Sequence, residues 1–193
     1  MKARHAIIAV LSLAGASALF TAAAFGDDEH EGREHDEGWF SRWSGSHGVA
    51  PVTNEQYRAE CGSCHMAYPP GLLPARSWET LMTGLADHFG DNAELDPDTV
   101  ATLRKYLVEN AADKVDSRRS AKIVRSIAAD KAPLRISETP YFQAKHDEIP
   151  ARMVKDNPKV KSFANCAACH TKAEQGDFNE HNVRIPGFER AHF

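Results

Sequence analysis

The sequence lacks an excess of positive charge and any extended strand pattern, and each absence excludes a class of protein. It carries 23 Lys and Arg against 27 Asp and Glu, so it lacks the basic footprint that nucleic-acid binding requires. No glycine-rich phosphate loop and no Ser-His-Asp arrangement is visible, which argues against chemistry on dissolved substrates. Aromatic residues make up only 8%, whereas the 42% of hydrophobic residues is an ordinary globular share.

Long apolar runs are also scarce, and the one that is present lies at the N-terminus. Residues 6–20 are apolar, follow a basic start and lead into a small-residue segment that ends at Gly26. This run is shorter than the about 18–20 residues of a membrane span, so we predict a signal peptide over residues 1–26. An uncleaved anchor is the alternative. No later stretch suits a bilayer, so the mature protein is expected in the periplasm without spanning a membrane.

An acidic, polar segment follows the predicted signal peptide. Residues 27–48 contain His30, His35 and His47 among many carboxylates. This composition predicts a flexible arm ahead of the folded domain, which we place at residues 49–193. Metal binding by the arm's histidines is the alternative interpretation.

The four cysteines form two copies of one pattern. Residues 61–65 are CGSCH and residues 166–170 are CAACH, and C-x-x-C-H is the attachment signal for c-type haem. Residues three apart lie on one side of a helical turn, so both thiols reach the vinyl groups of one porphyrin. The next residue then offers its imidazole to the iron. We therefore predict two covalently bound haems. The attachment residues would be Cys61, Cys64, Cys166 and Cys169, and the proximal iron ligands His65 and His170.

Disulfides, a redox C-x-x-C motif and a Cys/His zinc site are the alternatives for four exported cysteines. A redox motif does not require the trailing histidine, and no thioredoxin-like βαβ pattern is present. A zinc site gives no reason for histidine to follow both cysteine pairs directly. The haem interpretation therefore remains the preferred one.

Helix signals dominate the rest of the chain and predict a mostly α fold, with long loops wrapped around the two haems. Thr53 and Asn157 are expected to cap helices that lead into the two motifs. The other expected helices are residues 77–89, a helix capped by Asp96, residues 118–129, and a short helix from Thr139 to before Pro150.

The distal coordination position of each iron is also unassigned. It can be filled by a histidine, filled by a methionine or left open. His88 would share the apolar face of the helix at 77–89, and His146 shares a face with Phe142 and Ile149. Both are therefore candidate ligands. The weaker candidates are His192, His181, His47 and Met153.

Taken together, these segments resemble the bacterial periplasmic dihaem cytochrome c family. The resemblance is carried by residues 57–70, 72–78, 88–90, 166–170 and 183–186, and it covers about residues 51–186. It implies a mostly helical electron-transfer protein with two bis-histidine haems. The family's His-Phe-Gly segment places a ligand at His88, and its Lys-His-acidic-Ile-Pro segment places one at His146, which favours His146 over His192.

The resemblance also implies redox partner proteins. By analogy these are a membrane b-type cytochrome as donor and a small oxygen-binding c-type cytochrome as acceptor. We therefore expect an electron carrier and not an enzyme. The alternative is a dihaem peroxidase or a gas-reactive haem enzyme, which would need an open or displaceable position on one iron.

Overall fold

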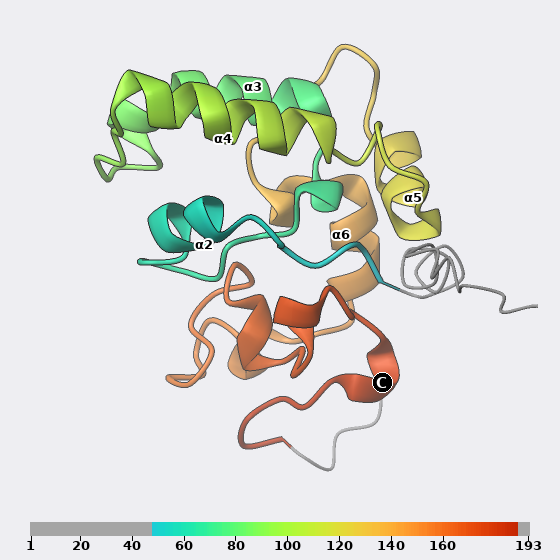
Figure 1. Cartoon of the computed structure of the whole chain (residues 1–193). Coiled ribbons are helices and arrows are strands. Elements are labelled where there is room, and N and C mark those ends of the chain that lie inside the picture. Colours follow the sequence, from blue (N-terminus) through green and yellow to red (C-terminus); the bar gives the residue numbers. More distant parts are fainter. Residues whose placement is uncertain (1–47, 189–193) are drawn as a thin grey trace, which may run out of the picture. The chain divides into compact units, whose positions relative to one another are not determined.

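The computed structural model describes residues 48–188, and within that range the chain forms helices and turns without a sheet (Figure 1). The α-helices are α2 (Glu55–Cys61), α3 (Ala75–Thr83), α4 (Pro97–Glu109), α5 (Arg118–Ser126) and α6 (Pro140–His146). Short 3-10 turns lie at Pro70–Leu72, Leu85–Asp87, Ile136–Glu138, Ala151–Met153, Cys166–Ala168, Ala173–Gln175 and Glu180–Asn182. The prediction of a mostly helical fold with long loops is confirmed.

Three helices begin at the residues that the sequence predicted. Asp96, Ser117 and Thr139 precede α4, α5 and α6, and each side chain accepts a hydrogen bond from the backbone N–H three residues later. Pro97 and Pro140 occupy the first helical positions, where a missing N–H costs nothing. These caps satisfy donors that would otherwise be unpaired at a helix N-terminus.

The helices next to the two cysteine motifs are shorter than predicted. Asn54 and not Thr53 caps α2, because its side-chain oxygen accepts the N–H of Tyr57, and the helix ends at Cys61. No α-helix follows Asn157 in the part of the chain described up to residue 188. Its backbone carbonyl instead accepts from Val160 and Lys161, and the chain then turns at Lys161, whose φ is 67°.

The helix expected at residues 77–89 is also different in the structure. Helix α3 starts two residues earlier and ends at Thr83, because Gly84 provides its C-cap and Leu85–Asp87 form a separate 3-10 turn. Ser77, the predicted cap, is buried inside the helix. The argument that His88 extends the apolar face of a continuous helix was therefore wrong.

The apolar residues pack in three clusters that support different parts of the chain. The first lies between α3 and α4, which run side by side (Figure 1). Its buried members are Val52, Tyr57, Leu73, Ala75, Trp78, Met82, Leu103, Leu107 and Ala111. The second joins Val49 and Leu72 to Ile123 and Ile127 of the α5 region. The third lies in the C-terminal loops and contains Met153, Val154, Val160 and Ile185.

The predicted signal peptide and all but the last residue of the arm lie outside the described residues, as does His192. All described residues belong to one unit of the chain, His35–Phe193. Between residues 48 and 188, no helix combines the length and the apolar character needed to cross a bilayer.

Candidate functional site

The four histidines predicted as ligands form two facing pairs. In site 1, which we define as Cys61, Cys64, His65 and His88, the imidazole centroids are 6.3 Å apart and the ring planes differ by 22°. In site 2, defined as Cys166, Cys169, His170 and His146, the centroids are 6.2 Å apart and the planes differ by 70°. The structure thus brings His88 to the first motif and His146 to the second.

Site 1 is built by the end of α2 and a tight turn. Cys61 is the last residue of α2, and Gly62 caps the helix by donating its N–H to Arg58. His88 is presented by a two-residue turn, because it pairs with Asp91 through backbone hydrogen bonds of 2.7 and 3.3 Å. Between them, Phe89 and Gly90 have φ values of 61° and 102°. Positive φ at both central positions is the pattern of a type I′ turn, which explains the glycine in this segment.

Site 2 is built by the end of α6 and by the C-terminal loops. His146 is the last residue of α6, and its ring stacks on Phe142 with centroids 3.8 Å apart. The second motif forms a 3-10 turn in which the N–H of His170 donates to Cys166. A later strand-like segment holds this motif in place, since His170 bridges to Val183 and the N–H of residue 184 donates to the Cys169 carbonyl.

Hydrogen bonds define which nitrogen of these rings can bind a metal. The Nδ1 atoms of His65 and His146 lie 2.8 Å from the carbonyl oxygens of Met66 and Phe142. A carbonyl only accepts, so each Nδ1 carries the proton and leaves the Nε2 lone pair available. The Nδ1 of His170 is buried and has no hydrogen-bond partner among the described residues.

The spacing of both pairs fits a metal held between two imidazoles. An imidazole nitrogen binds a transition metal at about 2.0 Å and lies roughly 1.1 Å from its ring centroid, so two opposed imidazoles place their centroids about 6.2 Å apart. The observed 6.3 and 6.2 Å agree with that value. All four cysteines are free, as thioether attachment to a porphyrin requires.

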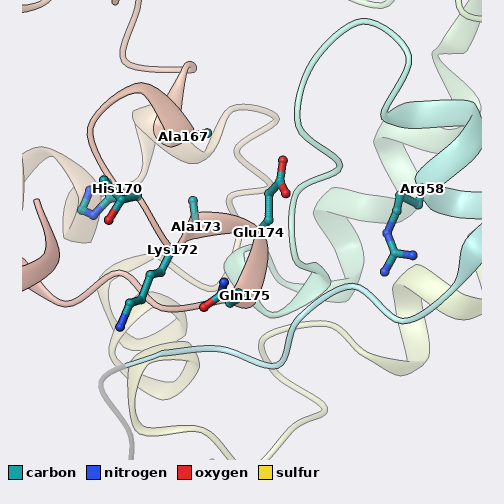
Figure 2. Close-up of a pocket in the computed structure, with 8 residues that line it drawn as sticks. Arg58, Ala167, His170, Lys172, Ala173, Glu174 and Gln175 are labelled. Carbon is teal, nitrogen blue, oxygen red and sulfur yellow. The ribbon is translucent and has the colours of Figure 1, made fainter. Parts of the chain in front are cut away.

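Open space also borders each pair. A cavity of about 490 Å³ adjoins His170 and Ala167 of the second motif, and Arg58 of α2 lies across it (Figure 2). A second cavity of about 540 Å³ adjoins His88, Phe89 and Arg135. The residues present therefore fit two haem groups, which would be attached at the cysteines and bound through the histidines.

Burial keeps these histidines neutral. It is the main cause that lowers the pKa of His88, of His146 and of His170, and the last falls to about 4 with added effects from His146 and Arg119. A neutral imidazole has the lone pair that metal binding needs. Burial also raises the pKa of Cys61 and of Cys166 to about 11, so both thiols stay protonated at neutral pH.

Aromatic residues that the sequence analysis did not single out surround the ligands. Tyr68 stacks on His65 with centroids 4.7 Å apart, and Phe178 contacts His170 at 5.4 Å. Phe163 meets the ring of His146 edge-on at 5.7 Å. In the sequence, the only sign of their role is that they lie close to the motifs along the chain. The contacts themselves depend on how separate loops pack.

The structure brings neither His181 nor Met153 to either pair. His181 is exposed, and its Nδ1 contacts Asn179 within its own turn. Met153 is buried in the third apolar cluster with Val154 and Ile185. His47 and His192 lie outside the described residues.

Comparisons with known proteins agree with this geometry. A family described as dihaem cytochrome c matches residues 57–178, a range that contains all four cysteines and all four paired histidines. The solved structure of a diheme cytochrome c from Shewanella baltica OS155 shares 49% identity, with a TM-score of 0.59, over 71% of this chain and 96% of that chain. No match is found among curated proteins.

Structures from Rhodobacter sphaeroides are similar as well. A diheme cytochrome c from that organism shares 48% identity, with a TM-score of 0.61, over 67% of this chain and 100% of its own. A second structure, of DHC purified from the same organism, shares 48% identity with a TM-score of 0.54, over 66% of this chain and 99% of its own.

Proposed function

The chain belongs to the dihaem cytochrome c family and is therefore an electron carrier with two c-type haems, and from that premise we propose that two histidines hold each iron. The proposed thioether attachment residues are Cys61, Cys64, Cys166 and Cys169. The proposed iron ligands are His65 with His88, and His170 with His146. The single observation that carries this assignment is the pairing of the imidazoles with their ring centroids 6.3 and 6.2 Å apart.

In this assignment the chain's residues position the cofactors, and they neither form nor break bonds during electron transfer. Each haem supplies a one-electron redox couple when bound. The backbone carbonyls at Met66 and Phe142 hold two of the rings in one tautomer, and aromatic side chains cover them. With imidazoles on both sides, no iron position remains for a substrate. The protein would thus pass electrons one at a time between a membrane or soluble donor and a haem-protein acceptor.

Export to the periplasm is part of the proposal. It is supported by the basic start and apolar run of residues 1–26. The family resemblance supports a membrane b-type cytochrome as donor and a small oxygen-binding c-type cytochrome as acceptor. We propose that the folded dihaem domain begins near residue 49, after the acidic arm.

Carbon monoxide binding to the reduced protein tests this function against a peroxidase or a gas-reactive enzyme. A small molecule can bind only where an iron position is open or its ligand is displaced. We expect no change in the reduced optical spectrum under carbon monoxide and only low-spin signals in the oxidised protein. A carbon monoxide adduct of the unaltered protein would overturn bis-histidine ligation and favour the enzymatic alternative.

A further inference from the structure

Tyr68 joins site 1 to the segment that leads into the second motif, although neither motif contains it. Its ring stacks on the imidazole of His65, with centroids 4.7 Å apart and planes 23° from parallel. Its hydroxyl donates a hydrogen bond of 2.6 Å to the carbonyl of Ala164, which lies 96 residues further along the chain. One side chain therefore joins the proximal imidazole of site 1 to the segment that carries the second motif.

The carbonyl of Ala164 continues this link to site 2. It also accepts the backbone N–H of Cys166 at 3.0 Å, and the Cys166 Sγ lies 3.6 Å from the same oxygen. The contacts thus run without a break from the His65 ring through Tyr68 and one carbonyl to a residue that attaches the second haem.

Site 1 also holds the backbone of Tyr68. The hydroxyl of Tyr57, a buried residue of α2, donates to the carbonyl of Tyr68 at 2.9 Å. Helix α2 ends at Cys61, so the same short element carries an attachment cysteine and anchors the bridging tyrosine. A phenol ordinarily ionises near pH 10, so both hydroxyls remain donors at neutral pH.

We propose that Tyr68 couples the two haem sites, its ring orienting His65 and its hydroxyl holding the Cys166 segment, and that it thereby sets the rate of electron exchange between them. The inference rests on the proposed bis-histidine function. The step moves one electron from the reduced site to the oxidised one, and no bond or proton changes. The rate of electron tunnelling falls less steeply with distance along bonds and hydrogen bonds than across open gaps. A continuous route through Tyr68 therefore favours exchange between the two sites.

Two variants at this position separate the ring from the hydroxyl. Tyr68→Phe keeps the stack on His65 and removes the bond to Ala164, whereas Tyr68→Leu removes both. Tyr106→Phe is the matched control, because Tyr106 packs on Tyr57 in the same aromatic group and makes no contact with Ala164. In partly reduced samples of the haem-loaded full chain, NMR exchange spectroscopy on the haem methyl signals gives the exchange rate. Its concentration-independent part is the intramolecular rate.

We expect Tyr68→Phe to slow this exchange severalfold, because the hydrogen bond to the Ala164 carbonyl is lost, while the site 1 EPR signal stays unchanged. Tyr68→Leu should slow it further and shift that signal, because the His65 ring is released. Tyr106→Phe should behave like the unaltered protein.

An unchanged exchange rate in Tyr68→Phe, with both irons still low-spin, would overturn the inference. The inference would also be overturned if exchange were slower in Tyr68→Leu but not in Tyr68→Phe. The hydrogen bond from the Tyr68 hydroxyl would then make no contribution to electron exchange. Failure of the proposed function looks different, because carbon monoxide would then bind the unaltered protein.

Discussion

The imidazole rings of His146 and His170 face each other with their planes crossed at 70°. Neighbouring side chains set this angle. Phe142 stacks on His146 within 9° of parallel and Phe163 stands against it at 80°, whereas Phe178 meets His170 at 66°. In site 1 the rings of His65 and His88 lie within 22° of each other. The two sites therefore share a ligand set and differ in ligand orientation.

This difference predicts two distinct EPR signals from the oxidised protein. Near-parallel imidazoles split the iron d orbitals and produce a rhombic low-spin signal with three resolved g values. Crossed imidazoles leave two d orbitals nearly equal in energy and produce one strongly anisotropic low-field peak. We expect a rhombic signal from site 1 and an anisotropic one from site 2. Two identical rhombic signals at low temperature would contradict the crossed geometry.

Removal of one distal histidine should open one iron and leave the other closed. His88→Ala is expected to expose the iron of site 1, and His146→Ala that of site 2. Each variant should show one high-spin iron and bind about one carbon monoxide per protein, because an unliganded position accepts small molecules. His181→Ala is the control, since the His181 ring contacts Asn179 within its own turn and lies in neither pair. Two open irons in either variant would contradict the pairing.

The reduction potential of site 2 should lie above that of site 1. Each site has one ligand whose Nδ1 donates to a backbone carbonyl, His65 in site 1 and His146 in site 2, so these bonds do not separate the two potentials. Solvent exposure does separate them, because Cys64 and His65 of site 1 are exposed whereas Cys169 and His170 of site 2 are half-buried, and burial disfavours the extra positive charge of the oxidised iron. For a one-electron couple, about 59 mV corresponds to a tenfold preference. A redox titration with NMR signals assigned to each haem gives the order, and equal or reversed potentials would contradict it.

Gly90 should be needed for stable ligation by His88. Its φ of 102° strains any residue with a side chain, at about 1–2 kcal/mol, although an added Cβ would meet nothing within 4 Å. Gly90→Ala should thus lower stability and weaken the turn that presents His88. Gly187→Ala is the matched control, with a φ of 83° and similar open space.

We expect both glycine variants to lose similar stability in denaturant titrations. Only Gly90→Ala should show a high-spin fraction at site 1 as the pH is lowered toward 5. A high-spin fraction of the same size in Gly187→Ala would mean that general destabilisation, and not the turn at His88, controls the ligand.

The free energy of unfolding should fall as the pH drops from about 6.5 to about 4. An unfolded histidine ionises near pH 6.5, whereas burial lowers the pKa of folded His170 to about 4. Between these values the unfolded chain binds more protons, so acid favours it, and above pH 6.5 the contribution is fully present. In the haem-bound protein, the iron competes for the same lone pair and extends this window to lower pH.

Guanidinium unfolding of the haem-loaded protein at pH 7.5, 5.5 and 4.5 measures this effect. The unfolding midpoint should decrease in that order, because His88 and His146 shift in the same direction as His170. A midpoint that does not change across these pH values would contradict a requirement for neutral buried histidines.

Local chemistry explains which features were predictable. The caps at Asp96 and Thr139 depend on residues within one turn of each other, and so do the two C-x-x-C-H motifs. The extent of the helix after residue 75 was mispredicted, because the apolar spacing continued past Gly84 while the backbone did not. His88 still reaches its partner, but through a two-residue turn at Phe89 and Gly90.

The amino-acid order alone determined the two C-x-x-C-H motifs and the starts of three helices, because each depends on neighbours a few residues apart. Only the tertiary structure decided the rest: the angle between His146 and His170, the unpartnered nitrogen of His170, and the bond from Tyr68 to Ala164. These features arise where loops distant in the chain pack together. Their geometry depends on the whole arrangement of contacts, which no local pattern specifies.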